Sequence, residues 1–90
     1  RLLVASAVGV YGDRGSELLT ESSGFGRGFL ADLGAAWESA ASAAPSSSTA
    51  LLRFGIVLSP RGGALKKMLP AFKLGLGGPL GDGRQFMSWI

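Results

Sequence analysis

The chain has 90 residues and a net charge of +3, with 47% hydrophobic and 17% charged residues, a composition that excludes a disordered chain. Cysteine and histidine are both absent, which excludes disulfides, thiolate metal ligands and an imidazole base, so no metal site is expected. No apolar run reaches the ~20 residues that a membrane-spanning helix needs, so we expect a cytoplasmic protein without a membrane partner.

The first expected strand is Leu2–Ala5, where apolar residues open the chain. Ser6 then falls at the carboxyl end of that strand, and the small residues around it would let the backbone approach a ligand closely. The hydroxyl of Ser6 either binds a ligand or bonds to a nearby backbone group. Tyr11 is either a packed aromatic residue or part of the wall of a site.

A long polar and glycine-rich excursion is expected at Gly12–Gly28. Loops of this length without helices or strands are often functional. Leu18 and Leu19 are predicted to anchor the excursion, and Thr20–Ser23 is predicted to form a turn.

A helix is predicted from Phe29 to about Ala44, because apolar residues recur there at the i, i+3, i+4, i+7 spacing. Trp37 is expected to pack as an anchor, and Glu38 is expected on the side facing away from the apolar stripe. Pro45–Thr49 should end the helix and connect it to the next strand.

The central strand is predicted at Leu51–Pro60, a run of apolar and β-branched residues with little alternation. Such a run is typical of a strand that is buried on both faces of a parallel sheet. Ligands collect at the carboxyl ends of such strands, here the polar and glycine-rich Ser59–Gly63. The central strand, the strand Leu2–Ala5 and the helix between them together predict a βαβ unit with a right-handed crossover.

After this strand a short helix is predicted from about Gly63 to Leu69, with a kink or a second turn starting at Pro70, because proline lacks an amide donor. Leu74–Gly83 should be a loop, either passing close to a ligand or serving as a flexible connector. Gln85–Ile90 reads as a short strand.

Charge is distributed unevenly along the chain, with a net −2 in residues 1–45 and a net +5 in residues 46–90. The basic half is either a solvated face or a site for an anionic ligand such as a dinucleotide or sugar nucleotide. Because its basic residues are not interleaved with stacking aromatics, no nucleic-acid partner is expected.

Three stretches carry a family resemblance: SAVGVYG at Ser6–Gly12, FLADLGAAWESAA at Phe29–Ala41, and LRFGIVLSPRGGALKKMLPAFKLGLGGPLGDGRQFMSWI at Leu52–Ile90. They resemble the middle of an extended short-chain dehydrogenase/reductase, and more closely its atypical subgroup of NAD(P)-dependent epimerase/dehydratase-like, or sugar nucleotide epimerase-like, proteins. The resemblance implies an α/β fold with a three-layer Rossmann-type parallel sheet. Residues 1–90 would be a single fragment, truncated at both ends, that holds only the C-terminal half of the nucleotide-binding domain.

The resemblance also implies a cofactor, NAD or NADP, and the residues around it. Ser6 would be the catalytic hydroxyl, although alignment on the Tyr-Gly pair puts the usual serine position on Ala7. The residues expected to bind the nicotinamide dinucleotide are Ser6, Ala7, Gly55, Ile56 and Val57. Those expected to bind a sugar-nucleotide-like substrate are Tyr11, Arg84 and Gln85.

One departure from the family pattern is the missing Tyr-x-x-x-Lys pair, whose lysine lowers the pKa of the tyrosine for proton transfer. The chain has one tyrosine, Tyr11, and the residue four positions later is Gly15. The helix that should carry the pair holds Phe29, Leu30, Leu33 and Gly34 instead. Two functions therefore stay open: an NAD(P)-dependent epimerase or oxidoreductase, and a non-catalytic dinucleotide-binding sensor or scaffold.

Overall fold

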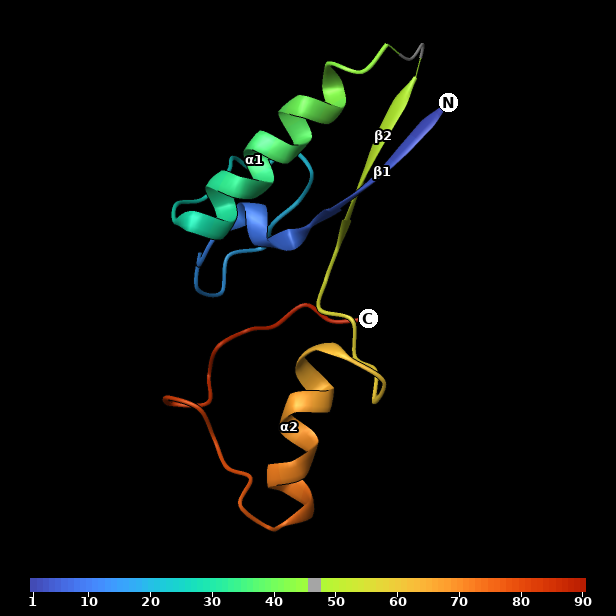
Figure 1. Ribbon diagram of the computed structural model, residues 1–90. Helices are drawn as coiled ribbons and strands as arrows, with labels where there is room; N and C mark the ends of the chain where they lie inside the picture. The colour runs from blue at the N-terminus through green and yellow to red at the C-terminus, as the bar shows by residue number, and fades with distance from the viewer. Residues whose placement is uncertain (46–47) are drawn as a thin grey trace. The chain divides into compact units, whose positions relative to one another are not determined.

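The computed structural model describes residues 1–45 and 48–90, which form two units, Arg1–Gly55 and Ile56–Ile90 (Figure 1). The elements in chain order are strand β1 (Leu2–Ala7), 3-10 helix η1 (Val8–Tyr11), helix α1 (Phe29–Ser42), strand β2 (Thr49–Phe54) and helix α2 (Gly63–Lys73). All of them except α2 lie in the first unit. Of the expected link Pro45–Thr49, Ser46 and Ser47 lie outside the described residues.

Strands β1 and β2 form a parallel sheet, with Leu2 opposite Thr49 and Ala7 opposite Phe54. Because α1 lies between the two strands in the chain, the predicted βαβ unit and the parallel α/β class are confirmed. The predicted extent of the central strand is wrong, since β2 starts at Thr49 and ends at Phe54. Beyond Ala7 the first strand turns into η1, so β2 has no partner on β1 past Phe54.

The rest of the predicted central strand pairs with a different segment. The Ile56 amide donates to the Ser88 carbonyl at 2.8 Å, and the Leu58 amide donates to the Ile90 carbonyl at 2.9 Å. This pairing is parallel, with a single bridge between Ile56 and Trp89. The strand predicted at Gln85–Ile90 is therefore reduced to the bridge at Trp89.

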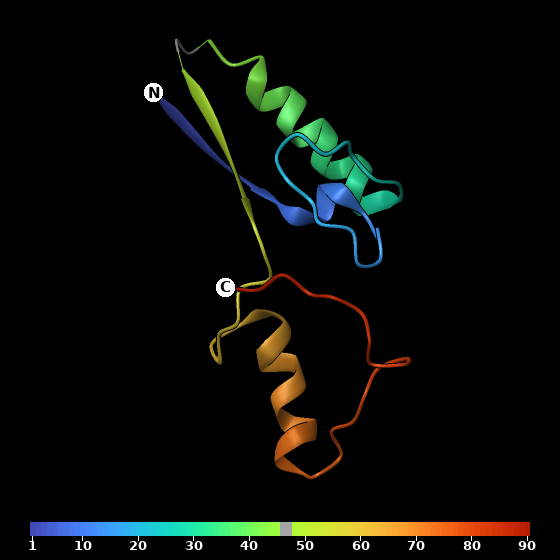
Figure 2. The same cartoon turned by 180° about the vertical axis from the view of Figure 1, so that it is seen from behind.

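Helix α1 covers one face of the sheet (Figures 1 and 2). Burial alternates along β1, so that Val4 and Ser6 are half-buried while Leu3 is 60% exposed. On β2, Leu52 and Phe54 are each 42% exposed. The expected burial of the strands on both faces is therefore wrong for the described residues, since only α1 covers the sheet and it can cover only one side.

Trp37 caps the outer edge of β1 instead of packing as an anchor. It is 57% exposed, and its Nε1 donates a hydrogen bond of 2.9 Å to the Ala5 carbonyl. In a parallel ladder alternate residues bond to opposite sides, and Leu2 bonds toward β2, so Ala5 faces the other edge. The prediction for Trp37 is wrong because an indole N–H has a free strand carbonyl within reach.

The helix predicted to end at about Leu69, with a kink or a second turn starting at Pro70, is longer, since α2 spans Gly63–Lys73 without interruption. Only the nitrogen of Pro70 lacks a proton, and the turn after it stays helical, because the Leu74 amide donates to the Pro70 carbonyl at 3.1 Å. No residue of α2 is buried, so the helix can adjust around the proline ring. The predicted loop at Leu74–Gly83 contains no helix or strand, as expected.

Candidate functional site

The most buried polar side chain of the described residues is Glu38 of α1, which is 4% exposed. Its carboxylate accepts three hydrogen bonds. Ser6 Oγ donates to Oε1 at 2.6 Å, Arg53 Nε donates to Oε1 at 2.8 Å, and Arg53 Nη2 donates to Oε2 at 2.7 Å. The carboxylate is thus held by two strands and buried under the helix that carries it.

Sheet register and helix period bring these three residues together. Ser6 of β1 stands directly opposite Arg53 of β2 in the parallel ladder, on the face that α1 covers. Ala31 and Glu38 are the two buried residues of α1, and seven positions place them on the same side of a helix. The charged pair therefore forms where the covered face of the sheet meets the buried stripe of the helix.

The guanidinium of Arg53 also reaches two aromatic side chains. Its Nη1 donates to the Tyr11 hydroxyl at 2.9 Å, and its central carbon lies 5.2 Å from the centroid of the Tyr11 ring and 5.3 Å from that of Phe25. A guanidinium combines donors in its plane with a face that stacks on rings, which an ammonium cannot do. Arg53 thus joins β2 to α1, to η1 and to the excursion at 12–28.

The pKa of Glu38 is lowered to about 2, chiefly by the hydrogen bonds from Arg53 and to a smaller extent by the bond from Ser6, against the opposing effect of burial. The pKa of Arg53 is raised above its ordinary value, first by Glu38 and then by Tyr11. Both groups therefore stay charged near neutral pH. A carboxylate with such a low pKa is a poor general acid or base at neutral pH, so this cluster holds the structure together instead of moving a proton.

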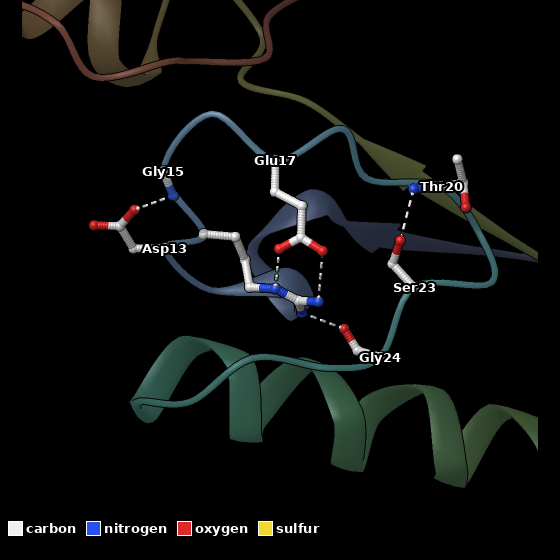
Figure 3. A network of polar contacts seen from close by, with 7 residues as sticks. Asp13, Gly15, Glu17, Thr20, Ser23 and Gly24 are labelled. Carbon is white, nitrogen blue, oxygen red and sulfur yellow. Dashed lines mark hydrogen bonds and ion pairs between the residues drawn. The ribbon is translucent and has the colours of Figure 1, made fainter.

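The excursion at 12–28 has no helix or strand, as predicted, yet its polar groups form hydrogen bonds with one another (Figure 3). Arg14 Nε donates to Glu17 Oε2 at 3.0 Å, and Arg14 Nη1 donates to the Gly24 carbonyl at 2.7 Å. The Ser23 amide donates to the Thr20 carbonyl, which confirms the predicted turn. These contacts close the segment upon itself.

Of the two leucines expected to anchor the excursion, one does not. Leu18 is 89% exposed, so this prediction is wrong, while Leu19 is half-buried. The segment is attached instead by its backbone, since the Gly26 amide donates to the Val10 carbonyl at 2.8 Å. Next to this attachment lies an open concavity of about 480 Å³, lined by Asp13, Arg14 and residues 24–27.

Ser6 and Ala7 end β1 on opposite faces of the sheet. The Ser6 hydroxyl points under α1 and donates to Glu38, whereas Ala7 is exposed on the uncovered face. The open choice for Ser6 was between a ligand and a backbone group, and the structure gives a third partner, a buried carboxylate. Tyr11 is 7% exposed and joins the same cluster through Arg53.

The other predicted site residues follow β2. Gly55 is half-buried and closes the first unit, while Ile56 and Val57 open the second unit and are 38% and 59% exposed. In the loop of the second unit the Arg84 amide donates to Asp82 Oδ1, and Gln85 Nε2 donates to the Leu80 carbonyl, both at 3.0 Å. The roles predicted for these residues stay predictions.

Sequence reasoning missed Glu38 and Arg53, and it placed Glu38 on the wrong side of its helix. One signal was available, because Arg53 stands in the apolar run Leu51–Phe54. A buried arginine needs an acidic partner, and α1 offers only Asp32 and Glu38. Neither residue appears in a metal-type cluster, since no group of three or more metal-binding side chains exists among the described residues.

The chain is similar to curated proteins along nearly its whole length. It is 50% identical over 91 residues to an epimerase family protein of Mycobacterium bovis, a match that covers 99% of this chain and 30% of that protein. It is 43% identical over 90 residues to the chloroplastic homolog of epimerase family protein SDR39U1 in Arabidopsis thaliana, covering 99% and 26%. No family model matches the chain.

Among solved structures, the chain is similar to the crystal structure of the nucleoside-diphosphate sugar epimerase from Corynebacterium glutamicum. The two share 45% sequence identity and a TM-score of 0.83, over 98% of this chain and 19% of that one. The chain thus spans less than a third of the length of the proteins it matches. No helix of residues 1–45 and 48–90 is long and apolar enough to cross a membrane, and a cytoplasmic location stays a prediction.

Proposed function

We infer that the protein, a member of the epimerase family of short-chain dehydrogenase/reductase proteins, binds a nicotinamide dinucleotide, NAD or NADP. The proposed site lies at the carboxyl ends of β1 and β2. The observation that carries this proposal is the register of the sheet. Ala7 and Phe54 end the two strands side by side, and both are exposed on the face that α1 leaves open. Open parallel sheets bind nucleotides just outside the carboxyl ends of their strands.

The residues here suit a flat ligand that lies close to the backbone. Ala7 has a small side chain, and Gly55 follows β2 directly with none. We propose that these two residues form the floor of the dinucleotide site in the first unit. Ile56 and Val57 belong to the second unit, and their predicted part in cofactor binding stays a prediction. When bound, the dinucleotide supplies hydride transfer, which no side chain of this chain can perform.

The proposed substrate class is a sugar nucleotide or a similar anionic small molecule. Two observations support it: the name of the Corynebacterium protein and the net charge of +5 in residues 46–90. Arg84 and Gln85 follow a loop rich in glycine and could contact a phosphate or a ribose. A guanidinium binds a phosphate by paired hydrogen bonds.

A second candidate function is a dinucleotide-binding sensor or scaffold that turns over slowly or not at all. The bond from Ser6 to Glu38 favours it, because this hydroxyl is engaged with a carboxylate that stays ionised at neutral pH. The missing Tyr-x-x-x-Lys pair favours it as well. A hydroxyl without an activating partner is a weak acid and base.

The test is a fluorescence titration of the natural protein with NADPH and NADH. Saturable binding of at least one is expected. Ala7→Leu should weaken that binding about tenfold or more, because the larger side chain would occupy the space over the strand ends. Ala43→Leu adds the same bulk at an exposed position after α1 and should leave binding unchanged.

Ser6→Ala separates binding from chemistry. It should weaken dinucleotide binding less than about tenfold, because the hydroxyl already donates to Glu38 and is not free to donate to the dinucleotide. Rapid turnover of a sugar nucleotide that Ser6→Ala abolishes would give Ser6 the catalytic role and reject the sensor. Failure of both dinucleotides to bind would reject the proposed function itself.

A further inference from the structure

The segment 12–28 leaves the end of η1 and returns to the same place before α1 begins. The Gly26 amide donates to the Val10 carbonyl, and Gly26 packs on the backbone of Tyr11 so closely that an added β-carbon would overlap the Tyr11 carbonyl. The contacts of Arg14 lie within the segment. They shape the excursion but do not attach it to the sheet.

One side chain attaches the segment to the sheet from outside. The guanidinium of Arg53 lies near two rings, with the centroid of Phe25 at 5.3 Å and that of Tyr11 at 5.2 Å. Phe25 belongs to the excursion and is the residue before Gly26. Because a cation is attracted to the face of an aromatic ring, this contact holds the returning end of the segment toward β2.

The orientation of Arg53 is fixed by groups outside the excursion. Two of its nitrogens donate to the buried carboxylate of Glu38, and a third donates to the Tyr11 hydroxyl. A guanidinium bound at three nitrogens cannot turn without breaking charged hydrogen bonds. The face that it offers to Phe25 is therefore set by α1 and η1.

We propose that Arg53 is a positioning residue, which transmits the fixed geometry of Glu38 and Tyr11 to Phe25 and thereby holds segment 12–28 in place beside the carboxyl end of β1. The inference rests on the proposed function in one respect: the segment is attached to η1, which directly follows the carboxyl end of β1 assigned to the dinucleotide. A segment already in place costs less to order when a ligand binds. Loss of the clamp should then weaken the ligand as well as loosen the segment.

Hydrogen exchange of the natural protein tests the clamp without any ligand. Phe25→Leu removes the ring and leaves the pair of Arg53 and Glu38 intact. It should speed exchange of the Gly26 amide and its neighbours in the segment about tenfold, with α1 and β2 unchanged. Phe25→Tyr keeps a ring and should restore slow exchange. The control Arg27→Lys changes an exposed arginine of the same segment and should have no effect.

Arg53→Lys supplies the second variant, since it keeps the charge but loses the planar face and the fork. The double variant Arg53→Lys and Phe25→Leu should loosen the segment no more than Arg53→Lys alone. Both changes break the same contact, that of Arg53 with the Phe25 ring. Additive effects, unchanged exchange at Gly26 in Phe25→Leu, or faster exchange spread evenly over residues 1–55 would each overturn the proposal.

Titration with NADPH then separates this inference from the proposed function. In Phe25→Leu the dissociation constant should rise about three- to tenfold, the cost of ordering a loosened loop. An unsubstituted protein that binds no dinucleotide would reject the proposed function, while the exchange result would still decide the clamp. Binding that is unchanged in Phe25→Leu despite a loosened segment would overturn the link between clamp and ligand.

Discussion

Gly34 of α1 packs directly on the side chain of Val10 in η1. A β-carbon added to Gly34 would come closer than 3.0 Å to Val10 Cγ1, and Val10 is 1% exposed. The helix can approach η1 this closely only because position 34 has no side chain. Since Leu30 and Gly34 have the spacing of the missing tyrosine and lysine, this contact gives a physical reason why a lysine does not stand there.

Gly34→Ala should therefore destabilise the protein, although alanine is the better helix former. Overpacking against Val10 should lower the free energy of unfolding by about 1–3 kcal/mol, against a gain in helix propensity of about 1 kcal/mol. Denaturant unfolding of the natural protein measures the difference. Gly9→Ala is the matched control, because nothing lies within 4 Å of a β-carbon there, and it should be near neutral. A stabilised Gly34→Ala would contradict the close packing.

Restoring the family spacing should not restore a proton relay. In the double variant Leu30→Tyr and Gly34→Lys, the lysine would have to displace Val10, whereas Leu30 is 69% exposed and its replacement would meet little resistance. We expect the double variant to lose stability and to gain no turnover of sugar nucleotides. Steady-state assays beside the unsubstituted protein check this. A gain in turnover above background would show that η1 moves easily.

Removing one member of the buried charged pair should destabilise the fold strongly. Glu38→Ala leaves Arg53 without its main partner and should cost about 3–5 kcal/mol in the free energy of unfolding. Ser6→Ala removes one of the three hydrogen bonds to the charged carboxylate and should cost less, about 1.5–3 kcal/mol. The double variant Glu38→Leu and Arg53→Met replaces the pair by apolar groups and should be less destabilised than Glu38→Ala. Equal losses in all three variants would argue against a buried pair.

Acid should weaken the protein through Glu38. Its pKa in the folded protein, about 2, lies below its ordinary value of 4.5. A carboxyl group with a depressed pKa stabilises the fold above the pKa of the unfolded chain, and this contribution disappears as the pH falls through the folded value. Stability should therefore decline between about pH 4.5 and 2 by a few kcal/mol. In Glu38→Gln this part of the decline should vanish in pH-dependent denaturation.

Arg84→Ala should weaken binding of an anionic ligand, if this loop contacts a phosphate as proposed. The loss expected for one charged hydrogen bond is about 1–3 kcal/mol. Calorimetry with a sugar nucleotide and with NADPH measures it. Arg61→Ala is the control at another exposed arginine of the second unit. Equal losses in both variants would indicate only the general positive charge of this half.

The order strand, helix, strand could be predicted from the sequence, because the patterns that encode it are local. The apolar residues of Phe29–Ser42 recur with the period of a helix, and the short apolar run in Leu2–Ala7 is typical of a strand. The stretches of family resemblance also lie in the sequence. For this reason the βαβ unit and the Rossmann-type class could be predicted before any contact was known.

Tertiary structure alone decided where the central strand ends and which charges are buried. The pairing of β2 stops at Phe54 because β1 turns away after Ala7, a fact that no residue after Phe54 encodes. The pattern of apolar residues in α1 predicts that Glu38 faces solvent. It becomes buried because the sheet register brings Ser6 and Arg53 beneath it, and a carboxylate leaves water only when such partners replace its hydration.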